Sequence, residues 1–140
     1  MYHKDDTFEG MIGGNKMKVN AKSIDLAKVQ AEAEESYRKG FFCCEAVMEV
    51  IMDNFELDVP HEIIKMASGM AIGVGKSGCI CGALNGGVLA ISMFFGRDEQ
   101  RGPKDPEVVK CMSMTNELHD WFRENNTKKA ACCRVLTREF

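Results

Sequence analysis

Seven cysteines give this chain its capacity for chemistry, and Cys79 and Cys81 lie one residue apart in the stretch KSGCICGALNGG. Cys81 falls at the predicted start of a helix, where free backbone N–H groups and the helix dipole stabilise negative charge. Cysteines at such positions tend to have a lowered pKa, and the thiolate is both a nucleophile and a metal ligand. Cys79 could resolve an oxidised Cys81 or bind a metal beside it. The chain has no C-x-x-C pair, so the spacing does not indicate zinc directly.

The same stretch is rich in glycine at helical spacing. Gly82, Gly86 and Ala90 recur every four residues. Each glycine inside a helix costs about 1 kcal/mol relative to alanine, so a compensating contact is expected. A second helix could approach closely along this face, or a bound group could lie against Gly82 and Gly86. The sequence does not decide between a neighbouring helix and a bound group.

The other cysteines are Cys43 and Cys44, Cys111, and Cys132 and Cys133. Cysteine is among the most buried residue types, so each of these is individually expected in the core. Neighbours on a helix point about 100° apart, so one member of each pair can face a site. Soft thiolates favour zinc, Cu(I) or iron–sulfur clusters. The candidate metal ligands are Cys43, Cys81, Cys111 and Cys133.

A glycine loop, GMAIGVGKSG, precedes Cys79 and invites comparison with a phosphate-binding P-loop. The required spacing places the first glycine on Met70, whereas Gly69 is one residue away. A helix rather than a strand is expected before the loop. We therefore interpret it as a connector between helices.

Composition restricts the function classes. The chain has 140 residues, of which 45% are hydrophobic and 28% charged, and its net charge is −3. This length suits one domain, and the acidic balance argues against a nucleic-acid partner. No apolar run approaches the roughly 20 residues that span a bilayer, and the first ten residues lack signal-peptide features. We expect a cytoplasmic protein without membrane insertion, in which seven cysteines do not form a disulfide framework by default.

The periodicity of the sequence predicts helices, and these helices must position the cysteine thiols. Residues 1–19 show no sustained period and are expected to form a flexible leader, followed by a cysteine-rich helical domain over 20–140. Glu45, Glu49 and Asp53 form a narrow polar stripe, so the helix that carries them is expected to be mostly buried. No segment alternates with period two, and the predicted fold is an all-α, single-domain bundle of five to six helices. The predicted helices cover residues 20–39, 41–55, 60–70, 81–95 and 106–122, with a short last helix that carries Cys132 and Cys133.

Residues 81–86, CGALNG, resemble the CGAxxG signature of the C_GCAxxG_C_C family, small bacterial proteins described as redox-active. The segment FFCCEAVMEV is similar to the upstream part of that family, and on this match Cys43 takes the family cysteine. Cys133, in a Cys-Arg-x-Leu stretch, looks like one of two C-terminal family cysteines. Alternatively, Cys111 and one of Cys132 and Cys133 fill these two places. The resemblance implies an all-helical redox protein and names no substrate.

Three hypotheses follow. The first is a thiol oxidoreductase in which Cys81 is the thiolate and Cys43, Cys79 or Cys133 is its exchange partner. The second is a protein that binds zinc or an iron–sulfur cluster through the same cysteines. The third is a structural helical protein whose cysteines fill the core. The redox partner is unknown, and a homodimer is expected because an apolar second helix and a glycine seam leave packing surface to cover.

Overall fold

The structure is a computed structural model of the chain, and it describes residues 7–12, 15–20, 23–55 and 59–138. Within these residues there are six α-helices and one short 3-10 helix, η2. Their bounds are α1 (Leu26–Lys39), α2 (Cys43–Asn54), η2 (His61–Ile64), α3 (Lys65–Ser68), α4 (Gly82–Phe95), α5 (Pro106–Glu124) and α6 (Cys133–Leu136). The prediction of an all-α, single-domain bundle of five to six helices is confirmed.

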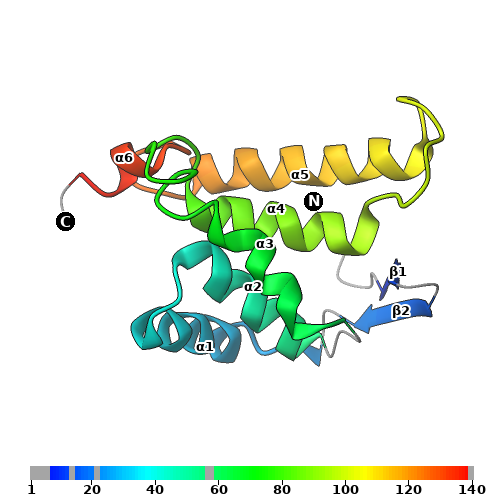
Figure 1. Ribbon diagram of the computed structural model, residues 1–140, viewed down its shortest axis with the longest axis horizontal. Coiled ribbons are helices and arrows are strands. Elements are labelled where there is room, and N and C mark those ends of the chain that lie inside the picture. The colour runs from blue at the N-terminus through cyan, green and yellow to red at the C-terminus, as the bar shows by residue number, and fades with distance from the viewer. Residues whose placement is uncertain (1–6, 13–14, 21–22, 56–58, 139–140) are drawn as a thin grey trace.

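The long helices pack in chain order across the molecule (Figure 1). Helix α2 packs against both α1 and α4, and α5 packs against the other side of α4. The core lies where α2 meets α4 and the η2–α3 segment. Its buried residues are Cys44, Met48, Met52, Ile64, Ala67, Ala71 and Ala90.

A β-hairpin precedes the helices. Strands β1 (Thr7–Ile12) and β2 (Asn15–Asn20) pair antiparallel, with Thr7 opposite Asn20, and β1 lies against α4. The sequence analysis expected a flexible leader here and no strand, because neither six-residue segment is long enough to show a sustained period. In the structure the two segments satisfy each other's backbone hydrogen bonds. The division into a leader and a helical domain at residues 19 and 20 stays a prediction.

Local signals set most helix ends. Asp25 caps α1 by accepting hydrogen bonds from the N–H groups of Ala27 and Lys28, at 3.0 and 3.2 Å. Gly40 ends α1 with a φ of 122°, a conformation that favours glycine. Pro106 is the first residue of α5, where its missing N–H is not needed. The predicted bounds of α2, α4 and α5 lie within about two residues of the observed ones, whereas the first helix was predicted to begin at residue 20 and begins at Leu26.

The third predicted helix differs from the observed structure. The sequence predicted one helix over 60–70, whereas the chain forms η2 and then the four-residue α3, which ends at Ser68. Gly69 follows directly and introduces a loop that continues to Cys81. No helix in the described part of the chain is long and apolar enough to cross a membrane.

Candidate functional site

Three cysteines lie at the starts of three different helices. Cys43 is the first residue of α2, Cys81 is the N-cap residue of α4, and Cys133 is the first residue of α6. Helices α2 and α4 are long enough to direct several unpaired N–H groups and a macrodipole at their first residues. We call Cys43, Cys81 and Cys133 the thiol cluster.

The glycine after Cys81 brings the first two thiols together. A Cβ atom built on Gly82 would lie 2.6 Å from Cys43 Sγ and 3.3 Å from the carbonyl oxygen of Met70. Only glycine therefore allows the sulfur of Cys43 to lie against the first turn of α4. One turn later, a Cβ on Gly86 would lie 2.8 Å from the carbonyl oxygen of Cys44. The space in front of both glycines is thus occupied by α2, and their predicted contact with a cofactor stays a prediction.

A short backbone pairing brings the C-terminal segment to the same place. The N–H of Cys81 donates to the carbonyl of Ala131 at 2.6 Å, and the N–H of Arg134 donates to the carbonyl of Gly78 at 3.2 Å. Residues 78–81 and 131–134 therefore run antiparallel beside each other. This pairing places Cys133, which is buried, beside the loop that carries Cys79 and Cys81.

Burial and neighbouring thiols control the protonation of Cys43. Burial raises its pKa most, and the charges of Cys81, Cys44 and Cys133 raise it further, to about 11. A hydrogen bond from the backbone N–H of Cys44 opposes this rise but does not cancel it. Cys43 is consequently a protonated thiol at neutral pH, although it begins a helix. The charges of Cys81 and Cys133 therefore both act on the protonation of Cys43.

Cys44 belongs to the core. Its side chain is fully buried, and its thiol donates to the carbonyl of Ala67 at 3.1 Å. Burial raises the pKa of Cys44, and the charge of Glu45 adds to this effect. The structure thus separates the adjacent cysteines: Cys43 faces the cluster, and Cys44 packs α2 onto α3.

The carboxylate of Glu45 stabilises the start of α2. The sequence placed Glu45 in a polar stripe with Glu49 and Asp53, but the structure buries it, with 9% of its surface exposed. Its carboxylate accepts hydrogen bonds from the N–H of Phe42, at 2.8 Å, and from the hydroxyl of Ser68, at 2.6 Å. Glu45 therefore caps the helix that begins with Cys43 and ties it to α3.

Cys79 is exposed and lies beside a guanidinium group. Arg134 Nη2 donates to Cys79 Sγ at 3.4 Å and to the carbonyl of Ser77 at 3.3 Å. The sequence analysis did not propose a role for Arg134. A role for Arg134 could have been inferred from its position directly after Cys133 in the Cys-Arg-x-Leu stretch.

The loop before Cys79 has an unusual backbone. Five consecutive residues, 72–76, have positive φ angles between 53° and 68°, and Ile80 has a φ of 45°. Ile72 and Val74 are β-branched, and such residues rarely adopt this conformation, so the loop is strained. Hydrogen bonds hold it, including those from the N–H of Gly75 to the carbonyl of Gly69 and from Gly78 to Ile72. The loop presents Cys79 and Cys81 in a defined conformation and is not a phosphate-binding P-loop.

The remaining cysteines do not join the cluster. Cys111 is buried on α5, where its sulfur lies 3.9 Å from the hydroxyl of Ser92. Ser92 follows Gly82 by ten residues along α4, which is about 15 Å of helix. Cys132 is the exposed N-cap residue of α6. Of Cys132 and Cys133, only Cys133 is buried, and its charge acts on the pKa of Cys43; which of Cys111, Cys132 and Cys133 fill the C-terminal positions of the family stays a prediction.

All seven cysteines lie in the described residues, and none of them is in a disulfide. Among these residues, no group of three or more His, Cys, Asp or Glu side chains is arranged to hold a metal ion. The predicted ligand set of Cys43, Cys81, Cys111 and Cys133 is not brought together, because Cys111 lies elsewhere. Binding of zinc or an iron–sulfur cluster stays a prediction.

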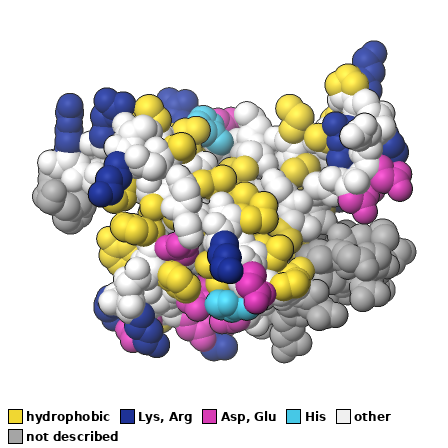
Figure 2. Space-filling model, viewed as in Figure 1, with side chains coloured by type: hydrophobic (Ala, Val, Ile, Leu, Met, Phe, Trp, Pro, Cys, Tyr) yellow, Lys and Arg dark blue, Asp and Glu magenta, His cyan; other side chains and the backbone are white. Residues whose placement is uncertain are grey.

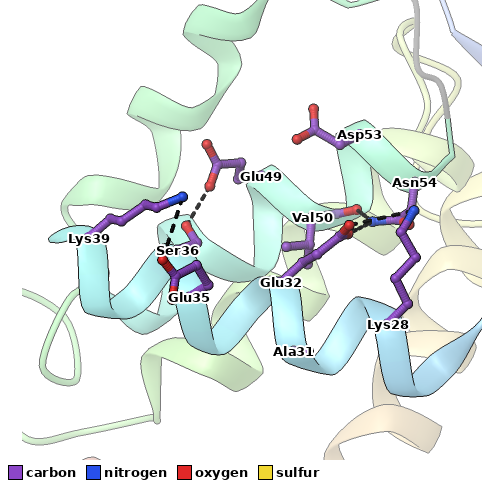
Figure 3. A pocket seen from close by; sticks show the side chains of 10 residues that line it. All are labelled: Lys28, Ala31, Glu32, Glu35, Ser36, Lys39, Glu49, Val50, Asp53 and Asn54. Carbon is purple, nitrogen blue, oxygen red and sulfur yellow. Dashed lines mark hydrogen bonds and ion pairs between the residues drawn. The ribbon is translucent and has the colours of Figure 1, made fainter.

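A polar groove lies away from the thiols, between α1 and α2 (Figure 3). Asn54 donates to Glu32 at 2.7 Å, and Ser36 donates to Glu49. The hydrogen bond from Asn54 lowers the pKa of Glu32, although burial opposes it. These contacts tie α1 to α2, so we assign the groove a role in packing and not in catalysis.

Comparison with known protein families shows which family the chain belongs to. The model of the C_GCAxxG_C_C family, described as "Putative redox-active protein (C_GCAxxG_C_C)", matches residues 41–139. The chain belongs to this family. The match confirms the resemblance found in the sequence, and it includes the three helices that begin at the thiol cluster. The comparison with curated proteins found no match, and the comparison with solved structures found none.

Proposed function

We propose that this member of the C_GCAxxG_C_C family is a thiol–disulfide redox protein whose exchanging pair is Cys81 and Cys43. The observation that carries the proposal is the position of Cys43 Sγ against Gly82, directly beside Cys81 at the start of α4. The raised pKa of Cys43, caused partly by the charge of Cys81, supports the same pairing. Membership in a family described as redox-active supports the reaction class.

The roles of the two thiols follow from their environments. Cys81 is the N-cap residue of a 14-residue helix, whereas burial raises the pKa of Cys43, so we assign Cys81 the role of nucleophile within this pair. Its thiolate attacks a disulfide of the partner, forms a mixed disulfide and releases one partner thiolate. Cys43 then loses its proton and attacks Cys81 Sγ. The products are the Cys43–Cys81 disulfide and a second partner thiol, so the partner is reduced by two electrons and the protein is oxidised by two.

Charge coupling orders these two steps. Burial raises the pKa of Cys43 most, and a thiolate at Cys81 raises it further, so Cys43 stays protonated. When Cys81 enters the mixed disulfide, that charge is lost, and the pKa of Cys43 falls. Burial still raises the pKa of Cys43 after this step, but the loss of the Cys81 charge makes the second thiol more reactive once the first has reacted. Cys133 is the buried third thiol that can replace Cys43 in the exchange.

A redox titration tests the proposal. The reduced protein is equilibrated with glutathione buffers under anaerobic conditions, and free thiols are counted after acid quenching. Wild type and Cys111→Ser are expected to lose two thiols reversibly as the Cys43–Cys81 disulfide forms, whereas Cys81→Ser cannot form this disulfide and does not lose two thiols. Equal titration of Cys81→Ser and wild type would contradict the proposal. So would stoichiometric zinc or iron in the anaerobically purified protein that is lost in Cys81→Ser, because that result favours the metal-binding alternative. We place the reaction in the cytoplasm, where reduced thiols persist.

A further inference from the structure

Positive charge is concentrated at the end of the molecule that carries the thiols. Residues 69–81 and 125–138, which include the paired segments 78–81 and 131–134, contain five Lys and Arg residues and no Asp or Glu. The whole chain, in contrast, has 21 acidic and 18 basic residues. Figure 2 shows several Lys and Arg side chains at the end where α6 and the loop lie. We call this the cationic end; its members are Lys76, Lys128, Lys129, Arg134 and Arg138.

One of these cations lies beside the exposed thiol. The guanidinium group of Arg134 is 3.4 Å from Cys79 Sγ and is held by the carbonyl of Ser77. A Cβ on Gly78 would lie 3.0 Å from Arg134 Cβ and 3.2 Å from Arg134 Nε. Glycine at position 78 therefore lets Arg134 lie across the loop. Arg134 is an exposed side chain whose guanidinium lies across the loop through its hydrogen bonds to Ser77 and Cys79.

This geometry matches a particular kind of substrate. A guanidinium presents a planar fork of N–H donors that binds a carboxylate through two hydrogen bonds. In a small disulfide with carboxylate groups, the carboxylate lies only a few bonds from the sulfur. One molecule can therefore place its carboxylate on Arg134 and its sulfur at Cys79. We propose that the cationic end selects low-molecular-weight anionic disulfides and that Cys79 is the thiol that reacts with them first.

The exchange sequence connects Cys79 to the proposed pair, so this inference rests on the proposed function. The thiolate of Cys79 attacks the anionic disulfide, forms a mixed disulfide and releases one anionic thiolate. Cys81 then attacks Cys79 Sγ and releases the second thiolate. The Cα atoms of residues two apart are at most about 7 Å apart, which is close to the range that a disulfide accepts. Finally, Cys43 attacks Cys81, the Cys43–Cys81 disulfide forms, and Cys79 returns to its thiolate.

Disulfide reagents that differ in charge test whether the cationic end selects anionic disulfides. The reduced full-length protein is mixed in a stopped-flow instrument with 5,5′-dithiobis(2-nitrobenzoate), which carries two carboxylates, or with uncharged 4,4′-dithiodipyridine. Arg134→Gln is expected to slow the anionic reagent about fivefold and to change the uncharged reagent less than about twofold. Raising the salt concentration should slow only the anionic reagent in wild type. Lys104→Gln, an exposed cation in the connector before α5, is the matched control and should change neither rate. Equal slowing of both reagents by Arg134→Gln, or of neither, would overturn the selection.

Mass spectrometry after one equivalent of the anionic reagent separates this inference from the proposed function. In Cys81→Ser, the mixed disulfide should persist on Cys79, whereas in wild type it should give way to the Cys43–Cys81 disulfide. If wild type also retains the label on Cys79, the first step stands and the proposed pair is wrong. If Cys79→Ser forms the Cys43–Cys81 disulfide at the wild-type rate, the pair stands and the role of Cys79 is overturned.

Discussion

The sulfur of Cys43 occupies the place where a side chain at Gly82 would be, because a Cβ built there would lie 2.6 Å from it. In the sequence Cys81 stands immediately before this glycine, within the segment that the family model matches. One small residue therefore does two things: it lets α2 and α4 approach closely, and it puts the first thiol of α2 beside the N-cap thiol of α4. The spacing of the CGAxxG motif thus has a physical reason.

Gly82→Ala should damage both packing and reactivity. The added methyl group meets Cys43 Sγ and cannot be accommodated without moving α2 away from α4. We expect a loss of about 1–3 kcal/mol in the free energy of unfolding, measured by urea denaturation. Gly69→Ala is the matched control, because nothing lies within 4 Å of a Cβ at that position and its φ is −69°. A Gly82→Ala protein as stable as Gly69→Ala would contradict the close approach.

The reactivity of Cys43 should depend on pH with a midpoint near its raised pKa. Its pKa rises from an ordinary value of 9.0 to about 11, chiefly through burial, so alkylation by iodoacetamide should stay slow at pH 8 and accelerate toward pH 11. Cys81→Ser removes one of the charges that raise this pKa and should shift the alkylation profile of Cys43 to lower pH. Cys111→Ser should leave the profile unchanged. The rates are measured by mass spectrometry of the peptide that contains Cys43.

The raised pKa of Cys43 also predicts the direction in which the free energy of unfolding changes with pH. A raised pKa in the folded state means that folding favours the protonated thiol, so this contribution is complete below pH 9. It is lost as the pH rises from about 9 to about 11. The free energy of unfolding of wild type should therefore fall more steeply over this interval than that of Cys43→Ser. Parallel curves for the two proteins would contradict the burial of an uncharged Cys43 thiol.

Glu45 should matter more than its neighbours on the predicted polar stripe. Glu45→Ala removes the acceptor for the N–H of Phe42 and the hydroxyl of Ser68, and it is expected to cost about 1–2 kcal/mol of stability. Asp53→Ala, at an exposed position on the same helix, should stay within about 0.5 kcal/mol of wild type. Thermal and urea unfolding of the two variants measure the difference. Similar losses in both would show that the buried carboxylate contributes nothing beyond its helix position.

The helices could be predicted because their signals are local. Pro106 at the start of α5 and Gly40 at the end of α1 act through their own backbone preferences. The apolar faces of α2 and α4 recur at helical spacing, so their burial could be expected, although the sequence did not say which helix packs against which. The pairing of residues 7–12 with residues 15–20 was missed because two six-residue strands stabilise each other, which a search for a sustained period does not detect.

The thiol site could be predicted only in part. Cys81 at the start of α4 was readable from the sequence, since helix position and residue type are local properties. The residues near Cys81 could not be predicted in the same way, because the backbone pairing of residues 78–81 with residues 131–134 is what brings Cys133 close to it. The left-handed run over 72–76 contains β-branched residues that argue against it locally, and the surrounding fold overrides that preference. The burial of Glu45 also depends on Ser68, which lies 23 residues away in the chain.

Disulfide mapping tests the central claim most directly. The full-length protein is oxidised with one equivalent of a disulfide reagent, free thiols are blocked at low pH, and the linked peptides are identified by mass spectrometry. The account predicts one peptide pair that joins Cys43 to Cys81, with Cys44 and Cys111 recovered as blocked thiols. A protein in which Cys81 remains a free thiol, or in which the disulfide joins cysteines outside the thiol cluster, would contradict it.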